Sequence, residues 1–275
     1  MEIKSLFKRL MGNNKKEEDN TSSFFPPQSV TYSSFSVQGR KAKQEDDCLI
    51  WHDNRDSVVI VADGVGSHGH GDFASYVTCH EVFEQRLNTM GVGEDPAQFL
   101  RDTCYWAAQE VYKKSTSDSE FKNCGTTLTG FVYRKDVGYW TINVGDSRVY
   151  LIKPSEKLVR QLTEDQTTDS STRKMKYAIG QPPDYLRPHI EVYAWDEEQD
   201  LLQPGDALMA VSDGVCEPFE IPSEANPNIY TDKPEFWEFL CNLQYDEKCA
   251  ERIVNNSFNA GSGDNITCAI MAMGK

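Results

Sequence analysis

Five short stretches of the chain place acidic side chains beside glycine or beside one another. They are QEDD (44–47), VADGVGSHGHGD (61–72), NVGDSR (143–148), VSDGV (211–215) and SGDNIT (262–267). Carboxylates that crowd together repel one another unless cations neutralise them. Ligand sets made only of oxygen favour Mg²⁺ or Mn²⁺ over zinc. A single Asp-Gly pair is usually an ordinary turn, so the prediction of a divalent-cation site depends on the five stretches together.

Two of these stretches repeat one arrangement, an apolar strand that runs into Asp-Gly. The segments are SVVIVADG (57–64) and DALMAVSDG (206–214). Burial of such a strand fixes the position of the carboxylate, and glycine lets the backbone turn sharply and approach a ligand. We therefore expect Asp63 and Asp213 each to be delivered to a turn at the end of a buried strand.

The elements that would position these carboxylates follow from apolar periodicity. Strands are expected at 30–37, at 57–64, in a meander over 126–153 with a turn near 135–138, at 206–211 and at 264–273, and helices at 72–88, 96–114 and 247–259. Many strands form hairpins while the helices come in separate pairs, which predicts an α+β fold rather than regular βαβ alternation. Two sheets packed face to face, with helices outside, would bury all the apolar strands.

The composition of the chain argues against several classes of function. The 275 residues carry a net charge of −15, which argues against nucleic-acid binding because that needs clustered Lys and Arg. No apolar run reaches the ~18 residues of a membrane span, and we expect no secretory leader. The eight cysteines form no CxxC pair, so we predict reduced thiols rather than a zinc site or a disulfide framework. Together these features predict a cytoplasmic protein.

Residues 1–28 differ from the rest and are predicted to be a flexible leader ahead of one domain at 29–275. Within the leader, Ile3, Leu6, Phe7, Leu10 and Met11 have the spacing of an apolar helix stripe, flanked by Lys4, Lys8 and Arg9. This pattern allows weak docking of residues 3–11 on an anionic membrane surface or in a partner groove, although an undocked leader is the simpler interpretation. The alternatives are a frayed leader and a helix that lies on its own domain.

The acidic stretches and several others together resemble one family, the metal-dependent protein phosphatases of the protein phosphatase 2C (PPM) type, in their bacterial form. The matching motifs, in the family's order, are Gln44-Glu45-Asp46-Asp47, Asp63-Gly64-Val65-Gly66-Ser67-His68, Gly125-Thr126-Thr127, Gly145-Asp146-Ser147-Arg148, Leu162-Thr163-Glu164-Asp165, Ser212-Asp213-Gly214 and Asp264-Asn265-Ile266-Thr267. The resemblance spans about residues 30–273. It implies a four-layer α-β-β-α sandwich of two antiparallel sheets flanked by helix pairs.

The resemblance also implies Mn²⁺ or Mg²⁺ as cofactor, with two ions and a weaker third. Asp63 would bridge the two ions, helped by the carbonyl of Gly64, and would be the central catalytic residue. The other implied ligands are Asp213 and Asp264 at the first ion, Glu45 and Asp46 at the second, and Asp146 with Asp213 at the third.

The implied reaction is hydrolysis of phosphoserine or phosphothreonine in proteins by direct attack of a water that bridges the metals. Paired cations neutralise the phosphate dianion and lower the pKa of that water. The sequence contains no Cys-x5-Arg loop, the motif that would indicate a mechanism with a covalent phosphocysteine intermediate. The implied partners are phosphoprotein substrates and an opposing Ser/Thr kinase, and we expect a monomer.

The chain departs from the family pattern where phosphate would be gripped. The family places an arginine four residues before the acidic pair, a position held here by Lys41, with Arg40 one place earlier. The preferred interpretation is that a one-residue shift brings Arg40 into the site. The alternative is that Lys41 substitutes as a point charge without the two-pronged geometry of a guanidinium. A solvated loop is the third alternative.

Other departures concern proton transfer and access. Val65 stands where animal members carry a histidine that acts as a general acid, and Gln166 stands where relatives usually carry histidine. His68 and His70 are interpreted as residues that shape the turn rather than as metal ligands. Residues 167–188 are predicted to be a flap beside the site, with a sequence that matches the family weakly, which leaves substrate preference open.

Two other functions remain as alternatives. One is a regulatory binding module on a phosphatase fold with little catalysis, although retention of Asp63, Asp213 and Asp264 argues against it. The other is a small-molecule phosphoesterase. A dinucleotide-binding role is disfavoured because residues 61–72 lack the GxGxxG spacing and carry an aspartate where pyrophosphate would lie.

Overall fold

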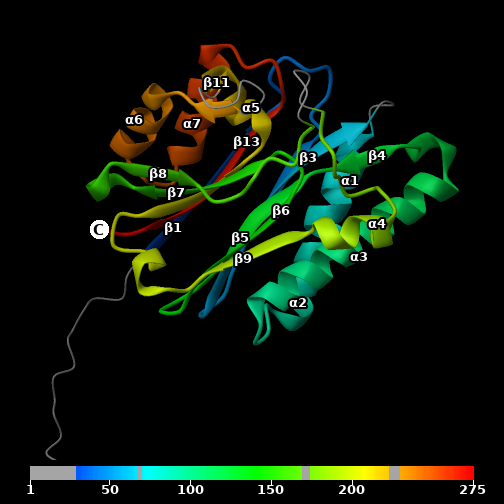
Figure 1. Ribbon diagram of the computed structural model, residues 1–275, viewed down its shortest axis with the longest axis horizontal. Coiled ribbons are helices and arrows are strands. Elements are labelled where there is room, and N and C mark those ends of the chain that lie inside the picture. The colour runs from blue at the N-terminus through cyan, green and yellow to red at the C-terminus, as the bar shows by residue number, and fades with distance from the viewer. Residues whose placement is uncertain (1–28, 67–69, 169–173, 223–229) are drawn as a thin grey trace, which may run out of the picture.

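The computed structural model describes residues 29–66, 70–168, 174–222 and 230–275. Two antiparallel sheets lie face to face (Figure 1). The first sheet has the order β2 (Asp46–His52), β3 (Asp56–Gly66), β5 (Leu128–Arg134), β6 (Gly138–Val144) and β9 (Glu191–Trp195), with β4 (Cys124–Thr126) on the end of β3. The second has the order β1 (Val30–Val37), β13 (Ile266–Met273), β10 (Ala207–Val211), β7 (Arg148–Lys153) and β8 (Leu158–Gln161).

Helices cover the outer face of each sheet (Figure 1). Outside the first sheet lie α1 (Gly71–Tyr76), the π-helical segment η1 (Val77–Glu84), α2 (Gln85–Met90), α3 (Pro96–Ser117) and α4 (Pro183–Leu186). Outside the second lie α5 (Asp213–Cys216), α6 (Pro234–Asn242) and α7 (Cys249–Ala260). A small hairpin of β11 (Glu220–Pro222) and β12 (Tyr230–Asp232) and the short helices η2 (Ser119–Phe121), η3 (Pro154–Glu156), η4 (Arg187–His189), η5 (Glu198–Asp200) and η6 (Glu217–Phe219) complete the described elements.

Three apolar layers hold this arrangement together. One lies between the two sheets and includes Val61, Phe131 and Leu208. A second lies between the first sheet and α1–α3, and a third between the second sheet and α6–α7. The four-layer sandwich expected from the sequence is therefore confirmed.

Local sequence explains where several elements begin and end. Helix α3 starts at Pro96, and the Asp95 side chain accepts from the Gln98 amide at 3.0 Å, which is the usual N-cap arrangement. Helix α7 ends at Ala260 and is capped by Gly261, whose φ of +105° suits glycine. The eight cysteines are free thiols, as predicted.

Two expectations about the acidic stretches were wrong. Asp63 does not lie in a turn, because β3 continues to Gly66 and pairs there with β4. Asp213 does not lie in a turn either, because it is the first residue of the short helix α5. In both cases a neighbouring element continues the regular backbone that glycine was expected to break.

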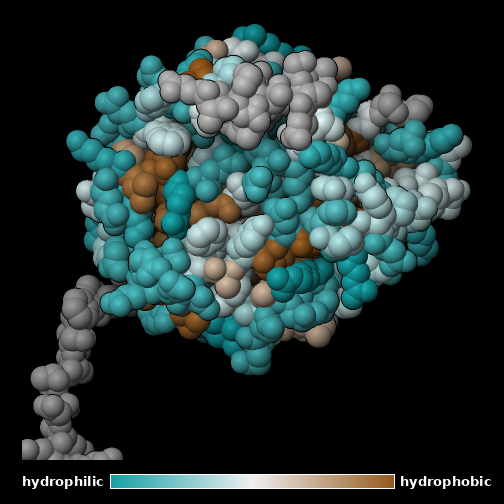
Figure 2. Space-filling view, viewed as in Figure 1, coloured by the Kyte–Doolittle hydropathy of each residue, from teal (hydrophilic) through white to brown (hydrophobic). Residues whose placement is uncertain are grey.

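On the face seen in Figure 2, hydrophobic residues form no single large area. The face seen in Figure 2 is mostly hydrophilic, with hydrophobic residues gathered in small separate areas. None of the described helices is both long and apolar enough to span a bilayer. The leader at 1–28, with the docking role expected for residues 3–11, lies outside the described residues.

Candidate metal centre

The two sheets bring together carboxylates that are far apart in the sequence. Asp46 on β2 lies directly opposite Asp63 on β3 in the antiparallel register. The hydroxyl of Ser212, at the end of β10, donates a hydrogen bond to Asp46 Oδ2 at 2.7 Å. That contact ties the second sheet to the first beside both carboxylates.

The charges of these groups act on one another strongly. Burial raises the pKa of Asp63 well above its usual value, and the charges of four other aspartates raise it further: Asp46, Asp213, Asp146 and Asp264. Burial also raises the pKa of Asp213 to about 8, again with help from Asp146 and Asp264. The structure therefore brings together five of the predicted metal ligands, one from each acidic stretch.

The donor atoms at this cluster suit a hard cation. The carboxylate of Asp63 lies close enough to those of Asp46 and Asp213 to affect the pKa of both, and ionised carboxylates can only accept hydrogen bonds. Accordingly, Asp46 Oδ1 and Asp213 Oδ1 are buried and have no hydrogen-bond partner among the described residues. Facing acceptor oxygens of this kind need a shared proton or a cation between them.

In the structure the described carboxylates do not yet have the arrangement of a complete metal-binding site. Within the described part of the chain, no group of three or more His, Cys, Asp or Glu side chains already has the arrangement of ligands for one ion. Repulsion between like charges favours such a spread. The fit to a divalent cation thus rests on the type of donor and on the unpaired buried oxygens.

The backbone of Asp63 is held by two threonines. Its amide donates to Thr127 Oγ1 at 2.9 Å, and its carbonyl accepts from the Thr127 amide and the Thr126 hydroxyl, each at 2.9 Å. The Thr127 hydroxyl in turn contacts Ser147 Oγ at 2.8 Å. Asp63 is thereby fixed to the loop that carries Asp146.

Glu45 and Gly64 lie where α1 begins. A Cβ on Gly64 would stand 2.3 Å from the Glu45 carbonyl oxygen and 2.4 Å from the Gly71 carbonyl carbon, so only glycine fits there. The Gly71 amide donates to Glu45 Oε1 at 3.0 Å. One oxygen of the Glu45 carboxylate is therefore directed to the helix start.

The turn that carries Asp264 also holds the loop that precedes β2. The Asn265 side chain donates to the carbonyls of Gln38 and Lys43 at 2.8 and 2.9 Å and accepts from the Glu45 amide at 2.9 Å. The sequence showed Asn265 as part of a motif but gave it no role. Its function in holding the loop depends on contacts more than 200 positions apart, which local sequence does not show.

The two candidate phosphate-binding residues take different directions. Lys41 Nζ lies 2.7 Å from Asp264 Oδ2, at the carboxylate cluster. Arg40 points to the outer side of α7, where its guanidinium lies 6.0 Å from the Phe258 ring centre and 3.4 Å from the Gly261 carbonyl oxygen. The geometry thus favours Lys41 over Arg40 as the cation at the site.

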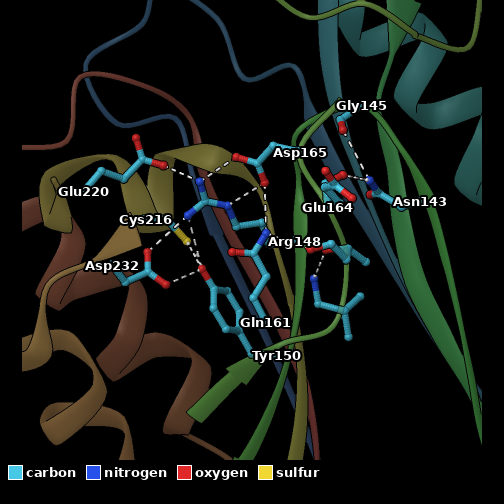
Figure 3. A network of polar contacts seen from close by, with 12 residues as sticks. Asn143, Gly145, Arg148, Tyr150, Gln161, Glu164, Asp165, Cys216, Glu220 and Asp232 are labelled. Carbon is cyan, nitrogen blue, oxygen red and sulfur yellow. Dashed lines mark hydrogen bonds and ion pairs between the residues drawn. The ribbon is translucent and has the colours of Figure 1, made fainter. Parts of the chain in front are cut away.

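Asp146 lies in a loop that a buried polar network holds in place (Figure 3). Gly145, with φ of +108°, exchanges two 2.9 Å hydrogen bonds with Gln166. Arg148 is 2% exposed. Its guanidinium contacts Asp165 at 2.6 and 2.9 Å, Asp232 at 3.1 Å, and Glu220. Sequence analysis noted Arg148 and Gln166 but did not predict this anchoring.

The remaining residues singled out from the sequence are Val65, His68, His70 and those of the expected flap. Val65 follows Asp63 by two positions on β3, and the centre of the His70 ring lies 5.1 Å from that of the Phe121 ring. His68 lies outside the described residues. In the described part of the expected flap, Ile179 bridges to Thr126 on β4, so this segment runs beside the centre.

Comparison with known proteins identifies the family of this chain. The sequence model of the family "Protein phosphatase 2C" matches residues 36–254 of this chain. The serine/threonine phosphatase stp of Listeria monocytogenes is 33% identical over 119 residues, which cover 42% of this chain and 46% of the relative. The chain thus matches about half the length of that relative. Protein phosphatase PhpP of Streptococcus pneumoniae is 26% identical over 259 residues, covering 86% of this chain and 94% of the relative.

Solved structures share the fold. The serine/threonine phosphatase Stp1 of Staphylococcus aureus has a TM-score of 0.72 at 19% identity, covering 90% of this chain and 96% of that one. The catalytic domain of the phosphatase PstP, in complex with two manganese ions, has a TM-score of 0.67 at 19% identity, with coverage of 90% and 100%. With its family match over most of the described domain and its two-sheet sandwich, this chain belongs to the protein phosphatase 2C family.

Proposed function

We propose that this protein is a metal-dependent protein serine/threonine phosphatase that uses Mn²⁺ or Mg²⁺. The observation that carries the proposal is the convergence of five aspartates, two of which present buried oxygens without a hydrogen-bond partner among the described residues. Family membership and the phosphatase names of the relatives support it. The PstP structure with two manganese ions supports the choice of metal.

Each residue would have a distinct part. Asp63, Asp213 and Asp264 would hold the first ion, with Asp63 shared by the second, and Asp46 and Glu45 would serve the second ion. Gly64 would add its carbonyl, and Asp146 would hold a third ion with Asp213. When bound, paired cations neutralise the phosphate dianion and supply a deprotonated water at neutral pH.

The chain's own side chains would then orient the substrate. The ammonium of Lys41 lies at the cluster and is placed to attract a phosphate oxygen as a point charge. Ser212 keeps one oxygen of Asp46 fixed by donating to it, which leaves the other for an ion. Water attacks phosphorus, the phosphorus–oxygen bond to the serine or threonine breaks, and the alcohol and inorganic phosphate leave. Val65 has no proton to give, so the leaving oxygen takes its proton from elsewhere.

The test is an assay of the purified chain with para-nitrophenyl phosphate and with a phosphothreonine peptide across a metal series. We expect turnover of both with Mn²⁺ or Mg²⁺, and loss of turnover when EDTA is added. Turnover that persists in EDTA would refute the metal assignment. Turnover of the small substrate without any of the peptide would favour a small-molecule phosphoesterase, and no turnover would favour a binding module.

We also propose that residues 29–275 are the catalytic unit, that the protein acts as a monomer on phosphoproteins, and that an opposing Ser/Thr kinase supplies them. Docking of residues 3–11 would then place the enzyme near a membrane or a partner. Deletion of residues 1–28 should leave turnover of para-nitrophenyl phosphate unchanged. A large loss in that variant would show that the leader belongs to the catalytic unit.

A further inference from the structure

A cavity of about 820 Å³ lies beside the centre, between the end of α3, β4 and the described part of the flap. We call it the α3–β4 groove. Its lining residues are Val65, Tyr112, 115–119, 122–125 and 178–182. Its volume is within the range of ordinary ligand sites in proteins.

The groove shares strand β3 with the candidate metal centre, because Val65 lines the groove and Asp63 lies on the same strand. Side chains two positions apart on a strand point to the same face, so Val65 in the groove follows Asp63 on one side of β3 at a spacing of about 7 Å. A Cβ on Gly125 would stand 2.7 Å from the Ile179 carbonyl oxygen and 3.7 Å from Val65 Cγ2. The flap backbone, β4 and Val65 thus meet at the floor of the groove.

The chemistry of the lining is polar but carries little charge. Ser115, Thr116, Ser117 and Ser119 supply hydroxyls, and the carboxylate of Asp118 is paired with Lys114 at 2.8 Å. Lys122 is exposed at the rim. A single cation among hydroxyl groups suits a polypeptide better than a highly anionic ligand, which needs several cations.

We propose that the α3–β4 groove binds the stretch of substrate polypeptide on one side of the phosphorylated residue, with an acidic side chain of that stretch against Lys122. This inference rests on the proposed phosphatase function, because the phosphate must lie at the centre for the neighbouring residues to reach the groove. Lys122 is then a specificity-determining residue and does not touch the reacting atoms.

The experiment is a charge-swap assay on the full chain with Mn²⁺. Phosphothreonine peptides carry one Asp or one Lys at successive positions on either side of the phosphothreonine, and kcat/KM is measured for wild type and for Lys122→Glu. At one position or more, wild type should prefer Asp over Lys by about two- to fivefold, the range of an exposed ion pair. Lys122→Glu should reverse that preference while turnover of para-nitrophenyl phosphate stays unchanged.

Two further variants separate this contact from general effects. Lys113→Glu makes the same charge change on α3 outside the lining and should keep the wild-type preference. Ser117→Trp adds bulk at an exposed lining position and should raise KM for the peptides alone.

Equal peptide preferences in wild type and Lys122→Glu would overturn the proposal while leaving the phosphatase function intact. If wild type hydrolyses neither substrate, the phosphatase function fails and this inference falls with it.

Discussion

Lys41 Nζ lies 2.7 Å from Asp264 Oδ2, so the loop before β2 brings a positive charge to the carboxylate cluster. The neighbouring Arg40 packs over Phe258 on α7 instead. Because Lys41 shares Asp264 with the proposed ion site, it would exchange this contact for substrate phosphate when an ion is bound.

The first prediction concerns this pair of cations. Lys41→Met should lower kcat/KM for para-nitrophenyl phosphate about tenfold, which corresponds to about 1.4 kcal/mol of lost transition-state stabilisation. Arg40→Met should change it far less, because its guanidinium contacts the Gly261 carbonyl away from the cluster. Steady-state kinetics of both variants give the comparison, and a larger loss in Arg40→Met would reverse the assignment.

The second prediction concerns Asp63→Asn, which should abolish turnover and leave the fold intact. Burial and four neighbouring carboxylates raise the pKa of Asp63, so its charge is unfavourable in the cation-free protein. The variant should therefore melt at or above the wild-type temperature in EDTA, and it should gain less stability from Mn²⁺. Asp136→Asn, in the exposed turn between β5 and β6, is the control because Asn tolerates its φ of +60°. Unchanged activity in Asp63→Asn would contradict the proposed mechanism.

The third prediction is a pH dependence of stability without metal. Burial, together with Asp146 and Asp264, raises the pKa of Asp213 from 3.8 to about 8, so the folded protein holds this proton more tightly than the unfolded chain. The contribution of Asp213 to stability is therefore fully present below pH 4 and is lost as the pH rises to about 8. Melting curves in EDTA between pH 5 and 9 should fall more steeply for wild type than for Asp213→Asn. Parallel curves for the two proteins would show that Asp213 ionises normally.

The fourth prediction concerns Arg148, the buried guanidinium shared by Asp165, Asp232 and Glu220 (Figure 3). Arg148→Met would leave three acidic groups without their cation and should lower the free energy of unfolding by about 3–5 kcal/mol. Lys113→Met, at an exposed pair 4.0 Å long, should have no measurable effect. Urea denaturation measures both, and a neutral Arg148→Met would mean that the acidic groups protonate without cost.

Much of the fold was predictable because strong periodicity survives into the structure. The expected strand at 30–37 is β1, and the expected helix at 96–114 is α3 with one further turn. Strand β9 was not predicted, since its five residues are half-buried or exposed and show no clean alternation. Helix α6 was also missed, although Pro234 at its first position is a recognised start signal.

The candidate site was predictable only as a set of motifs. The order of the acidic stretches indicated which aspartates would meet, and the structure places Asp46, Asp63, Asp146, Asp213 and Asp264 within electrostatic reach of one another. Their metal-binding roles stay predictions until a metal series is measured. Ser212 and Asn265 support the site through contacts between segments that are distant in the chain. Local sequence patterns therefore could not predict these roles.

Strand β13 lies between β1 and β10 in the second sheet, although more than 200 residues separate it from β1 in the chain. The ribosome synthesises β1 and the strands of the first sheet long before β13. During that time β1 has no β13 with which to form its backbone hydrogen bonds. Asp264, at the entrance to β13, is the last of the five aspartates to be synthesised. A growing chain would therefore lack one of the proposed metal ligands until synthesis is nearly complete, and β1 is the segment that we expect a chaperone to shield during that time.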